Sequence, residues 1–571
     1  MKNEQIASLF SQLADLLEIQ EANPFRVRAY RNGARKIQST AESMSAMIED
    51  GGDLTQFDGI GKDLAKQIEE IVATGQHEQL VELKQQVPPG VVDMLRIPGV
   101  GPKKVAVFFN QLNLETMEDL KQAATEGRLS ALKGFGKKTE ESILKNIDRA
   151  VEAGKRVSIA IATEAASAVV ESLLALDQVS QAAVAGSCRR RKETCGDLDV
   201  LATAEDTGAA MDCLEAHPLT EEVLLRGDTK MRVRLRTGVE MDLRVVPDES
   251  YGAAMQYFTG SKEHNVVVRQ RAKDLGLKVN EYGVFNGEEL VAGATEEEVY
   301  AAVGLPWVPP ELRENRLEFA YADSAQQAMP ELVTVGDIQG DLHMHTTATD
   351  GAGTILEMAE AAKARGLKYI AITDHSKRVS MANGLDADRL RAHWEQVREA
   401  RSKISGIEIL CGIECDILED ATMDLDDEVL SEADWVLGVL HYGLQQPRKQ
   451  IMERLLNAIK NPHVDIIGHP TGRIVGQREG ADVDLKELLQ AASDHGKMLE
   501  INAHYKRLDL SDVHAAAAKE MGIPIVISTD AHTLDGFDVL PYGIDVARRA
   551  GLTKDDVANT KTWDEFKKLL R

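Results

Sequence analysis

Disulfide-forming and membrane-spanning features are scarce in this sequence. Its five cysteines form no Cys-x-x-Cys pair, which argues against a disulfide framework and indicates reduced thiols in a reducing compartment. No hydrophobic run approaches the ~18–20 residues of a membrane span. The N-terminal stretch MKNEQIASLF lacks the apolar core of a signal peptide. We therefore expect a soluble, cytoplasmic protein with no membrane partner.

Basic side chains are also in short supply over the chain as a whole. The 66 Lys and Arg residues face 93 Asp and Glu, and the formal net charge of −27 taken alone argues against nucleic-acid binding. The deficit is uneven, however: the net charge is −3 over residues 1–150, −13 over 151–340 and −11 over 341–571. The first segment can therefore carry local basic patches.

A repeated Gly-x-Gly turn followed by a helical pattern organises this first segment, after amphipathic helical stretches predicted at 4–20 and 25–49. The glycines permit a tight turn, and the next helix offers free N–H groups to an anion. One such turn is weak evidence, since an ordinary helix cap looks alike. Three copies followed by lysines predict helix-hairpin-helix units that bind the DNA backbone without reading its sequence. The predicted DNA contacts are Gly59, Gly61, Lys62, Gly99, Gly101, Lys103, Gly134, Gly136 and Lys137.

Residues 186–199, GSCRRRKETCGDLD, predict a site for a nucleoside triphosphate and its metals. Asp197 and Asp199 lie one residue apart on a strand, so they point to the same face and can share a cation such as Mg²⁺. The Gly-Ser turn exposes backbone N–H donors to an anion, and the arginines can neutralise the remaining phosphate charge. Asp242, in the strand predicted at 239–247, is expected to add a third carboxylate, which suits two-metal phosphoryl transfer.

Residues 339–571 predict a parallel barrel, because seven short apolar strands alternate with helical stretches. Chemistry in such barrels takes place at the carboxyl ends of the strands. A lone His after a strand is usually structural, but six recur here together with several acids. Imidazole and carboxylate ligands suit Zn²⁺, Mn²⁺ or Fe²⁺, which predicts a multi-metal hydrolytic site. The candidates are His343, His345, Asp350, Asp374, His375, Glu414, His441, His469, Asp530 and His532.

These motifs carry two resemblances that together cover nearly the whole chain. The first 315 residues resemble the family X DNA polymerases in the glycine turns, GSCRRRKETCGDLD, VEMDLRVV and YFTGSKEHNVVVR. The remainder resembles the polymerase and histidinol phosphatase (PHP) domain in DLHMH, TDH, GIECDI, LGVLHYG, GHP and STDAH. In this order, the two parts resemble the bacterial family X polymerases that have a 3′–5′ exonuclease.

The resemblance implies a multidomain fold. It consists of helical helix-hairpin-helix N-terminal domains, an α+β nucleotidyltransferase palm and thumb, and a C-terminal distorted (β/α)7 PHP barrel. The expected bounds are 1–80 for a DNA-binding domain like the family's 8-kDa domain, 81–150 for a fingers-like domain, 151–250 for the palm, 251–315 for the thumb, 316–338 for a linker and 339–571 for the barrel.

The resemblance also implies roles for single residues. The catalytic metal ligands would be Asp197, Asp199 and Asp242, with Asp242 helping to activate the primer 3′-hydroxyl. Nucleotide binding would fall to Gly186, Ser187, Arg190, Tyr257, Phe258, Gly260 and Asn265, and Arg269 would contact the template. In the barrel, the three metals would be held by His343, His345, Glu414 and Asp530; by Glu414, His441 and His469; and by Asp350, His375 and His532.

The implied function is a DNA repair polymerase that fills short gaps, in base excision repair or in end joining. Its barrel would be a 3′–5′ exonuclease, with abasic-site or 3′-end processing as a further activity. Its partners would be gapped or primer-template DNA, dNTPs and single-stranded 3′ ends, and we expect a monomer. The implied cofactors are Mg²⁺ or Mn²⁺ at the polymerase site and two or three Mn²⁺, Zn²⁺ or Fe ions in the barrel.

Three alternatives stay open at this point. The palm could belong to another nucleotidyltransferase, and the barrel could be a small-molecule phosphomonoesterase or a scaffold without activity. Two positions also depart from the family pattern. Gln67 stands where the polymerase beta family has a Schiff-base lysine for removing 5′-deoxyribose phosphate, which puts that lyase activity in doubt, and His504-Tyr505 replaces a more usual Asn-Pro.

Overall fold

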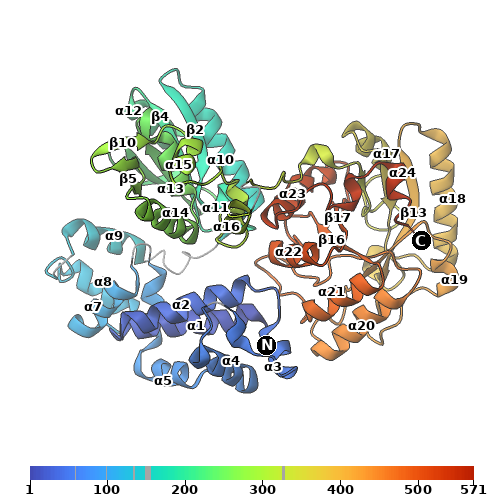
Figure 1. Cartoon of the computed structure of the whole chain (residues 1–571), viewed down its shortest axis with the longest axis horizontal. Helices are drawn as coiled ribbons and strands as arrows, with labels where there is room; N and C mark the ends of the chain where they lie inside the picture. The colour runs from blue at the N-terminus through green and yellow to red at the C-terminus, as the bar shows by residue number, and fades with distance from the viewer. Residues whose placement is uncertain (58, 98–99, 133–134, 148–155, 325–327, 571) are drawn as a thin grey trace. The chain divides into compact units, whose positions relative to one another are not determined.

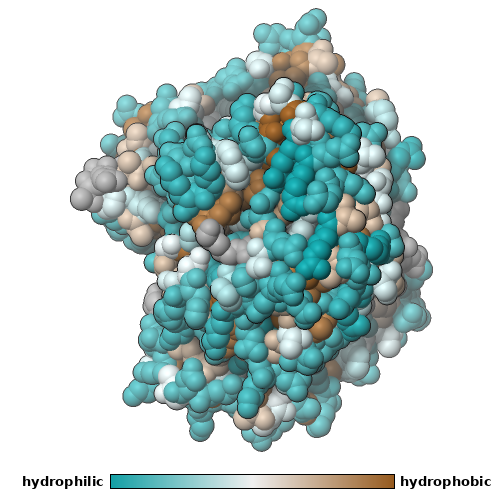
Figure 2. Space-filling model, turned by 90° about the vertical axis from the view of Figure 1, so that its right-hand side faces the viewer, coloured by the Kyte–Doolittle hydropathy of each residue, from teal (hydrophilic) through white to brown (hydrophobic). Residues whose placement is uncertain are grey.

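The computed structural model describes the chain except for residues 58, 98–99, 133–134, 148–155, 325–327 and 571. It divides into two compact units, Met1–Lys155 with Asp484–Lys486, and Arg156–Val483 with Glu487–Arg571. Within the described residues, no helix has the length and apolar character that crossing a bilayer requires. The face drawn in Figure 2 is covered mostly by hydrophilic residues, in keeping with the 28% of charged residues in the sequence.

The first unit is built of helices packed on a shared hydrophobic core that includes Phe10, Ile68 and Phe108, all fully buried. The helix predicted over 25–49 is wrong as a single element. Its first part ends at Ser39, and a second helix begins at Met44 because the Ser43 side chain accepts a hydrogen bond from the Ala46 N–H. The helices are α1 (Asn3–Ile19), α2 (Pro24–Ser39), α3 (Met44–Glu49), α4 (Lys62–Thr74), α5 (Glu78–Gln86), α6 (Pro89–Asp93), α7 (Pro102–Leu112), α8 (Met117–Thr125) and α9 (Lys137–Ile147) (Figure 1).

The second unit begins with a five-stranded sheet in the order β2-β4-β7-β6-β5, with α10 (Ile159–Leu174) and α12 (Thr207–Ala216) packed on it. The central pair β4–β7 is parallel and the other pairs are antiparallel. The alternation of Met231, Val233 and Leu235 with arginines matches a strand with one buried face, as predicted. The strands are β2 (Val179–Ala185), β4 (Asp197–Ala204), β5 (Thr220–Arg226), β6 (Lys230–Leu235) and β7 (Glu240–Val245).

A smaller α+β part follows the sheet. It contains α13 (Tyr251–Thr259), α14 (Lys262–Asp274), the antiparallel strands β8 (Lys278–Asn280), β9 (Gly283–Asn286) and β10 (Glu289–Ala292), and α15 (Glu296–Ala302). Its central charge cluster joins Glu296 to the fully buried Arg313 and to Arg189, with nitrogen–oxygen distances of 2.6–3.1 Å. The next stretch includes α16 (Glu318–Ala322) and Leu332, which pairs with Thr553.

The last part is a seven-stranded parallel sheet in sequence order, which confirms the predicted barrel. The strand predicted at 340–345 is shorter than expected and ends at Asp341. Beyond it, the His345 N–H donates to the Ala531 carbonyl and the Asp530 N–H to the His343 carbonyl, so the first and last strands nearly close the barrel. The strands are β11 (Gly340–Asp341), β12 (Tyr369–Ile372), β13 (Glu408–Asp416), β14 (Trp435–Val439), β15 (Ile466–Ile467), β16 (Met498–Asn502) and β17 (Ile525–Ser528).

Helices alternate with these strands and cover the outside of the barrel (Figure 1). They are α17 (Ile355–Ala364), α18 (Ala387–Lys403), α19 (Asp427–Leu430), α20 (Arg448–Lys460), α21 (Leu485–Asp494), α22 (Asp512–Glu520), α23 (Leu540–Arg549) and α24 (Trp563–Phe566).

The buried Glu296 cluster predicts a stability effect. The pKa of Glu296 is lowered to about 2, because Arg313 and Arg189 outweigh the burial that opposes ionisation. Glu296→Gln leaves Arg313 buried without its partner and should lower the free energy of unfolding by about 3 kcal/mol in urea titrations followed by tryptophan fluorescence.

The pH dependence and a surface control make this prediction specific. Because the folded pKa lies below the ordinary 4.5, the contribution is present at neutral pH and is lost as pH falls from about 4.5 towards 2. The stability gap between wild type and variant should therefore narrow over that window. The exposed Glu297, changed to Gln, should have no such effect, and an equal effect of both changes would contradict the prediction.

Candidate active sites

The palm sheet brings three carboxylates to one place. Strands β4 and β7 are parallel neighbours in which Asp199 pairs in register with Asp242, and Asp197 lies two residues before Asp199 on the same face. The pKa of Asp199 is raised to about 6 by burial first, and then by the charges of Asp197 and Asp242. Gathered carboxylates that repel one another in this way are suited to hold divalent cations.

Basic side chains of strand β6 lie around Asp242, the third carboxylate. The sequence reasoning did not single out these basic residues. Arg232 of β6 pairs in register with Asp242, and its guanidinium donates to both carboxylate oxygens, to Oδ2 at 2.8 Å. The Lys230 ammonium lies 3.2 Å from the same Oδ2. The pKa of Asp242 is lowered, because these cations outweigh the burial that raises it. The sequence signal that could have identified these residues is the alternation of apolar and basic residues along β6. It places Lys230 and Arg232 on the face towards Asp242.

The predicted phosphate turn follows β2 directly. Gly186 has φ +64°, and a Cβ there would collide with the Asp199 carboxylate, so only glycine fits. Arg190 lies beside this turn. Its guanidinium donates to the carbonyl of Thr259 at 2.5 Å and, through Nε, to Glu314 at 3.1 Å.

The remaining predicted nucleotide contacts lie on α13 and α14, except Gly260, which follows the last residue of α13. Tyr257 and Phe258 form an edge-to-face pair with ring centroids 5.1 Å apart, and the Arg244 guanidinium lies 4.3 Å from the Phe258 ring centre. Asn265 is 8% exposed and its amide is already engaged: it donates to the Tyr257 carbonyl and accepts from Gln256, both at 2.7 Å. Arg269 is exposed.

The barrel collects a second and denser group of metal-ligand side chains at the carboxyl ends of its strands. Glu414 is at its centre: its Oε1 lies 3.3 Å from His343 Nε2, 3.4 Å from His441 Nε2 and 2.9 Å from His469 Nε2. His345, Asp350, His375 and His532 form a neighbouring group, and His343, His469 and Asp530 another. The structure thus brings together all the side chains expected to hold the three metals, and the groups overlap, since His469 lies near Asp530 as well as near Glu414.

The donor atoms of this group fit metal ions. Several buried atoms have no hydrogen-bond partner among the described residues, including His343 Nε2, His345 Nδ1 and His469 Nδ1. Burying such atoms unpaired is costly, and a cation would satisfy them. Asp374 differs, because its carboxylate is taken up by Thr346, Thr349 and His393 and it belongs to none of the ligand groups found in the described chain.

A surrounding set of polar residues orients the histidines. Glu500 accepts from His343 Nδ1 at 2.7 Å and from the His469 N–H at 2.6 Å, so the His343 Nε2 faces the other ligands. Asp416 lies 3.0 Å from His441 Nδ1, and Asn502 donates to Asp530 at 3.0 Å. Such partners fix the ring orientation of metal-bound histidines. The sequence reasoning missed Glu500 and Asp416, because no spacing distinguishes them from other acids.

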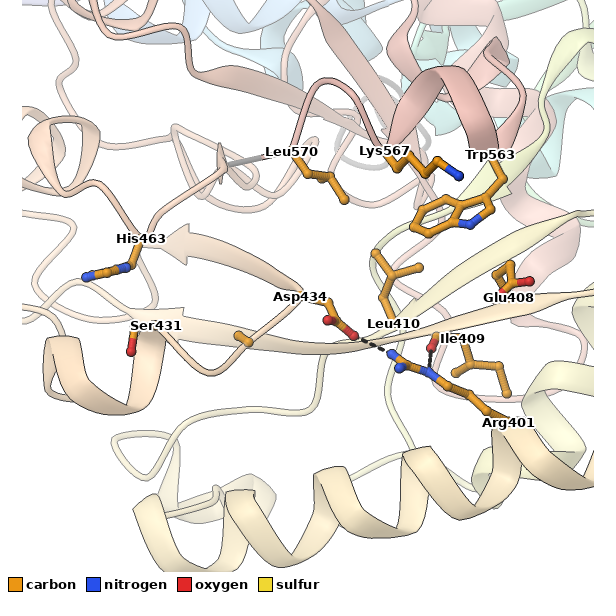
Figure 3. Close-up of a pocket in the computed structure, with 11 residues that line it drawn as sticks. Arg401, Glu408, Ile409, Leu410, Ser431, Asp434, His463, Trp563, Lys567 and Leu570 are labelled. Carbon is orange, nitrogen blue, oxygen red and sulfur yellow. Dashed lines mark hydrogen bonds and ion pairs between the residues drawn. The ribbon is translucent and has the colours of Figure 1, made fainter.

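A cavity of about 530 Å³ lies at the opposite end of the barrel. Its lining includes Glu408, the first residue of β13, and Asp434, which precedes β14. Figure 3 shows Arg401 paired with Asp434 beneath Trp563 and Lys567 from the C-terminal helical segment. None of the predicted metal ligands lines this cavity, so it is separate from the metal-ligand group.

The glycine turns of the first unit lie at the beginning of helices, as predicted. Helices α4, α7 and α9 begin immediately after Gly61, Gly101 and Gly136, with open space around each glycine, and Lys62, Lys103 and Lys137 are exposed. The predicted contacts Gly99 and Gly134 lie outside the described residues. On α4, Gln67 is hydrogen-bonded to the buried His77 at 3.1 Å, whereas Lys66 is exposed.

Family models match five stretches of the chain. They are a helix-hairpin-helix domain at residues 1–77, a SAM-like helix-hairpin-helix tandem at 91–149, the DNA polymerase beta palm at 159–236, the DNA polymerase beta thumb at 254–314 and the PHP domain at 341–504. These models fall on the helical unit, the palm sheet, the α+β part and the barrel.

Curated relatives match in two ways. The DNA polymerase/3′–5′ exonuclease PolX of Bacillus subtilis is 38% identical over 576 residues, covering 100% of both chains. A probable phosphatase of Thermoanaerobacter sp. (strain X514) is 35% identical over 233 residues, which are 38% of this chain and 89% of the relative. A probable phosphatase of Caldanaerobacter subterraneus is 32% identical over 242 residues, 40% and 90% of the two chains.

Glu500 offers a test of the barrel's metal site that does not depend on activity. In an Asp197→Ala, Asp199→Ala background, in which the palm ligands are removed, Glu500→Ala should weaken Mn²⁺ binding by about 10–100-fold in calorimetric titrations, because His343 and His469 lose their common anchor. The exposed Glu520, changed to Ala in the same background, is the control. Unchanged affinity in the Glu500 variant would mean that these histidines do not hold the ion.

Proposed function

Because this chain belongs to the family X DNA polymerases that carry a C-terminal PHP domain, we propose that it extends primers on gapped DNA with its palm and removes 3′-terminal nucleotides with its barrel. The full-length likeness to a DNA polymerase/3′–5′ exonuclease carries this proposal. The two separate groups of metal-ligand side chains support it, because each reaction needs its own centre.

In the palm, Asp197, Asp199 and Asp242 would hold Mg²⁺ or Mn²⁺, which supplies charge stabilisation and lowers the pKa of the primer 3′-hydroxyl. The 3′-oxygen attacks the α-phosphorus of the incoming dNTP, and pyrophosphate leaves. Asp242 lies on the primer side and is kept ionised by Arg232. Gly186, Ser187 and Arg190 bind the triphosphate through backbone N–H groups and a guanidinium.

Elsewhere in the polymerase part, Tyr257, Phe258 and Gly260 contact the sugar of the incoming nucleotide. Asn265, whose amide is already bonded within the protein, holds the backbone of Tyr257 in place for that contact. The exposed Arg269 remains free for the template. The helix-hairpin-helix turns bind DNA phosphates with Lys62, Lys103 and Lys137, in line with their exposure.

In the barrel, the histidines and carboxylates grouped around Glu414 would hold Mn²⁺, Zn²⁺ or Fe ions, which activate a water molecule for attack on phosphorus. Water cleaves the terminal phosphodiester, and the 3′-oxygen of the preceding nucleotide leaves. Glu500 and Asp416 keep His343 and His441 oriented throughout. A phosphomonoesterase acting on terminal phosphates is the second candidate, favoured by the likeness of the barrel to probable phosphatases.

The two centres should be separable by substitution. The Asp197→Ala, Asp199→Ala variant should lose primer extension on gapped DNA and keep Mn²⁺-dependent degradation of single-stranded 3′ ends. His343→Ala should do the reverse. Gel analysis of one labelled gapped substrate measures extension and degradation together, and phosphate release distinguishes the two barrel activities: an exonuclease liberates nucleoside 5′-monophosphates, a phosphomonoesterase free phosphate. Loss of both activities in either variant would contradict the two-centre proposal.

Arg232 provides a finer test of the palm. Arg232→Met removes the two hydrogen bonds to the Asp242 carboxylate. The kcat for nucleotide insertion should therefore fall by about 10–100-fold, with little change in the KM for dNTP. Arg234→Met is the matched control, because Arg234 lies on the same face of β6 but pairs with Glu222 and Glu240. Equal losses in the two variants would show that Arg232 acts only through the sheet.

A further inference from the structure

One arginine of the barrel reaches the predicted triphosphate turn of the palm within the second compact unit. Arg549 ends α23, is 2% exposed and makes three contacts. Its Nη1 donates to the backbone carbonyl of Arg190 at 2.7 Å and to Glu314 Oε1 at 3.0 Å, and its Nη2 donates to Asp512 at 2.8 Å. A barrel side chain thus contacts both Arg190 and the carboxylate that pairs with Arg190.

Glu314 is the shared element of this arrangement. Its Oε1 accepts from Arg190 Nε at 3.1 Å as well as from Arg549, and the Glu314 side chain is 15% exposed. The pKa of Glu314 is lowered to about 2, because Arg549 and then Lys192 and Arg190 outweigh the burial that raises it. A carboxylate this close to Arg190 competes with a bound triphosphate for the same guanidinium.

Other ion pairs join the barrel to the palm and thumb without touching this turn. Arg316 binds Asp512 at 2.7 Å, Arg548 binds Glu311 at 2.7 Å, and Arg473 binds Glu193. These contacts suffice to hold the parts together, and a purely structural Arg549 would be equivalent to them. Arg549 differs from these arginines in two contacts. It shares the Glu314 carboxylate with Arg190, and it donates a hydrogen bond to the backbone carbonyl of Arg190.

We propose that Arg549 of the barrel is a positioning residue of the polymerase centre, which engages Glu314 and the Arg190 carbonyl and thereby leaves the Arg190 guanidinium available for the triphosphate. The proposal rests on the triphosphate role proposed above for Arg190. When Arg549 is absent, Glu314 pairs more fully with Arg190, and the charge offered to the incoming nucleotide is partly neutralised. Arg549 therefore lowers the KM for dNTP from a different domain.

The test is single-nucleotide gap filling by the full chain, with kcat and the KM for dNTP measured separately. Arg549→Met should raise the KM about tenfold and change kcat less, because an interaction with the triphosphate is weakened. Arg549→Lys should recover only part of the loss, since one ammonium cannot make the three forked contacts. Arg548→Met, which removes the neighbouring ion pair to Glu311, should leave the KM unchanged.

A second substitution separates electrostatic competition from simple damage. Glu314→Gln in the Arg549→Met background removes the competing carboxylate, so the double variant should bring the KM back towards the wild-type value. A structural defect would worsen with the second change. Exonuclease activity on single-stranded DNA should remain at the wild-type level in every variant, because none of the Arg549 contacts in the described part of the chain involves a metal-ligand side chain of the barrel. This activity also verifies that the protein is folded.

The outcomes distinguish this inference from the proposed function beneath it. If Arg190→Met leaves the KM for dNTP unchanged, the triphosphate role of Arg190 is wrong and the inference falls with it. If Arg190→Met raises the KM but Arg549→Met does not, or if Arg548→Met has the same effect as Arg549→Met, only the role of Arg549 is overturned. Failure of Glu314→Gln to restore the KM would overturn the competition mechanism.

Discussion

Burial of carboxylates in a partly dehydrated site is the constraint on which both centres of this protein depend. In the palm, burial and the two neighbouring carboxylates raise the pKa of Asp199 to about 6, whereas Arg232 and Lys230 outweigh the burial of Asp242 and lower its pKa. Such an arrangement costs free energy unless cations offset it. The parallel pairing of β4 with β7 holds Asp199 opposite Asp242 in spite of this cost. The repulsion between the carboxylates falls when a cation binds to them.

The barrel meets the same constraint in a different way. Its central acid, Glu414, is surrounded by histidines in place of arginines, and imidazole can be a neutral ligand where a guanidinium would repel a metal. Further acids such as Glu500 accept hydrogen bonds from the second ring nitrogens of the histidines. The negative charge is therefore divided between Glu414 and the acids behind the histidines. The palm therefore keeps room for a charged substrate, whereas the barrel is built to retain several ions.

Sequence reasoning predicted those parts of the fold and sites that have a local signal. The period of two places Asp197 and Asp199 on one face, the strand–helix alternation gives the barrel, and the histidines follow strand ends. Long-range pairings such as Arg232 to Asp242, Glu500 to His343 and Arg549 to Glu314 left no such trace, because they depend on which strands and helices become neighbours. The break between α2 and α3 was missed for the opposite reason: the cap at Ser43 is local, but it lies within a continuous helical pattern.

The buried position of Arg549 bears on how the two activities share one chain. An arginine that is 2% exposed is stable only with its carboxylates in place, and these come from both sides: Asp512 belongs to the barrel and Glu314 to the stretch that the thumb model matches. Separating the barrel from the palm would expose all three charges and leave Glu314 free to pair fully with Arg190. The barrel is then more than a nuclease attached by a linker, since its charges help to set how well the palm holds a nucleotide. Selection for the polymerase activity would then act on a side chain of the barrel, which gives a physical reason for the two centres to remain in one polypeptide.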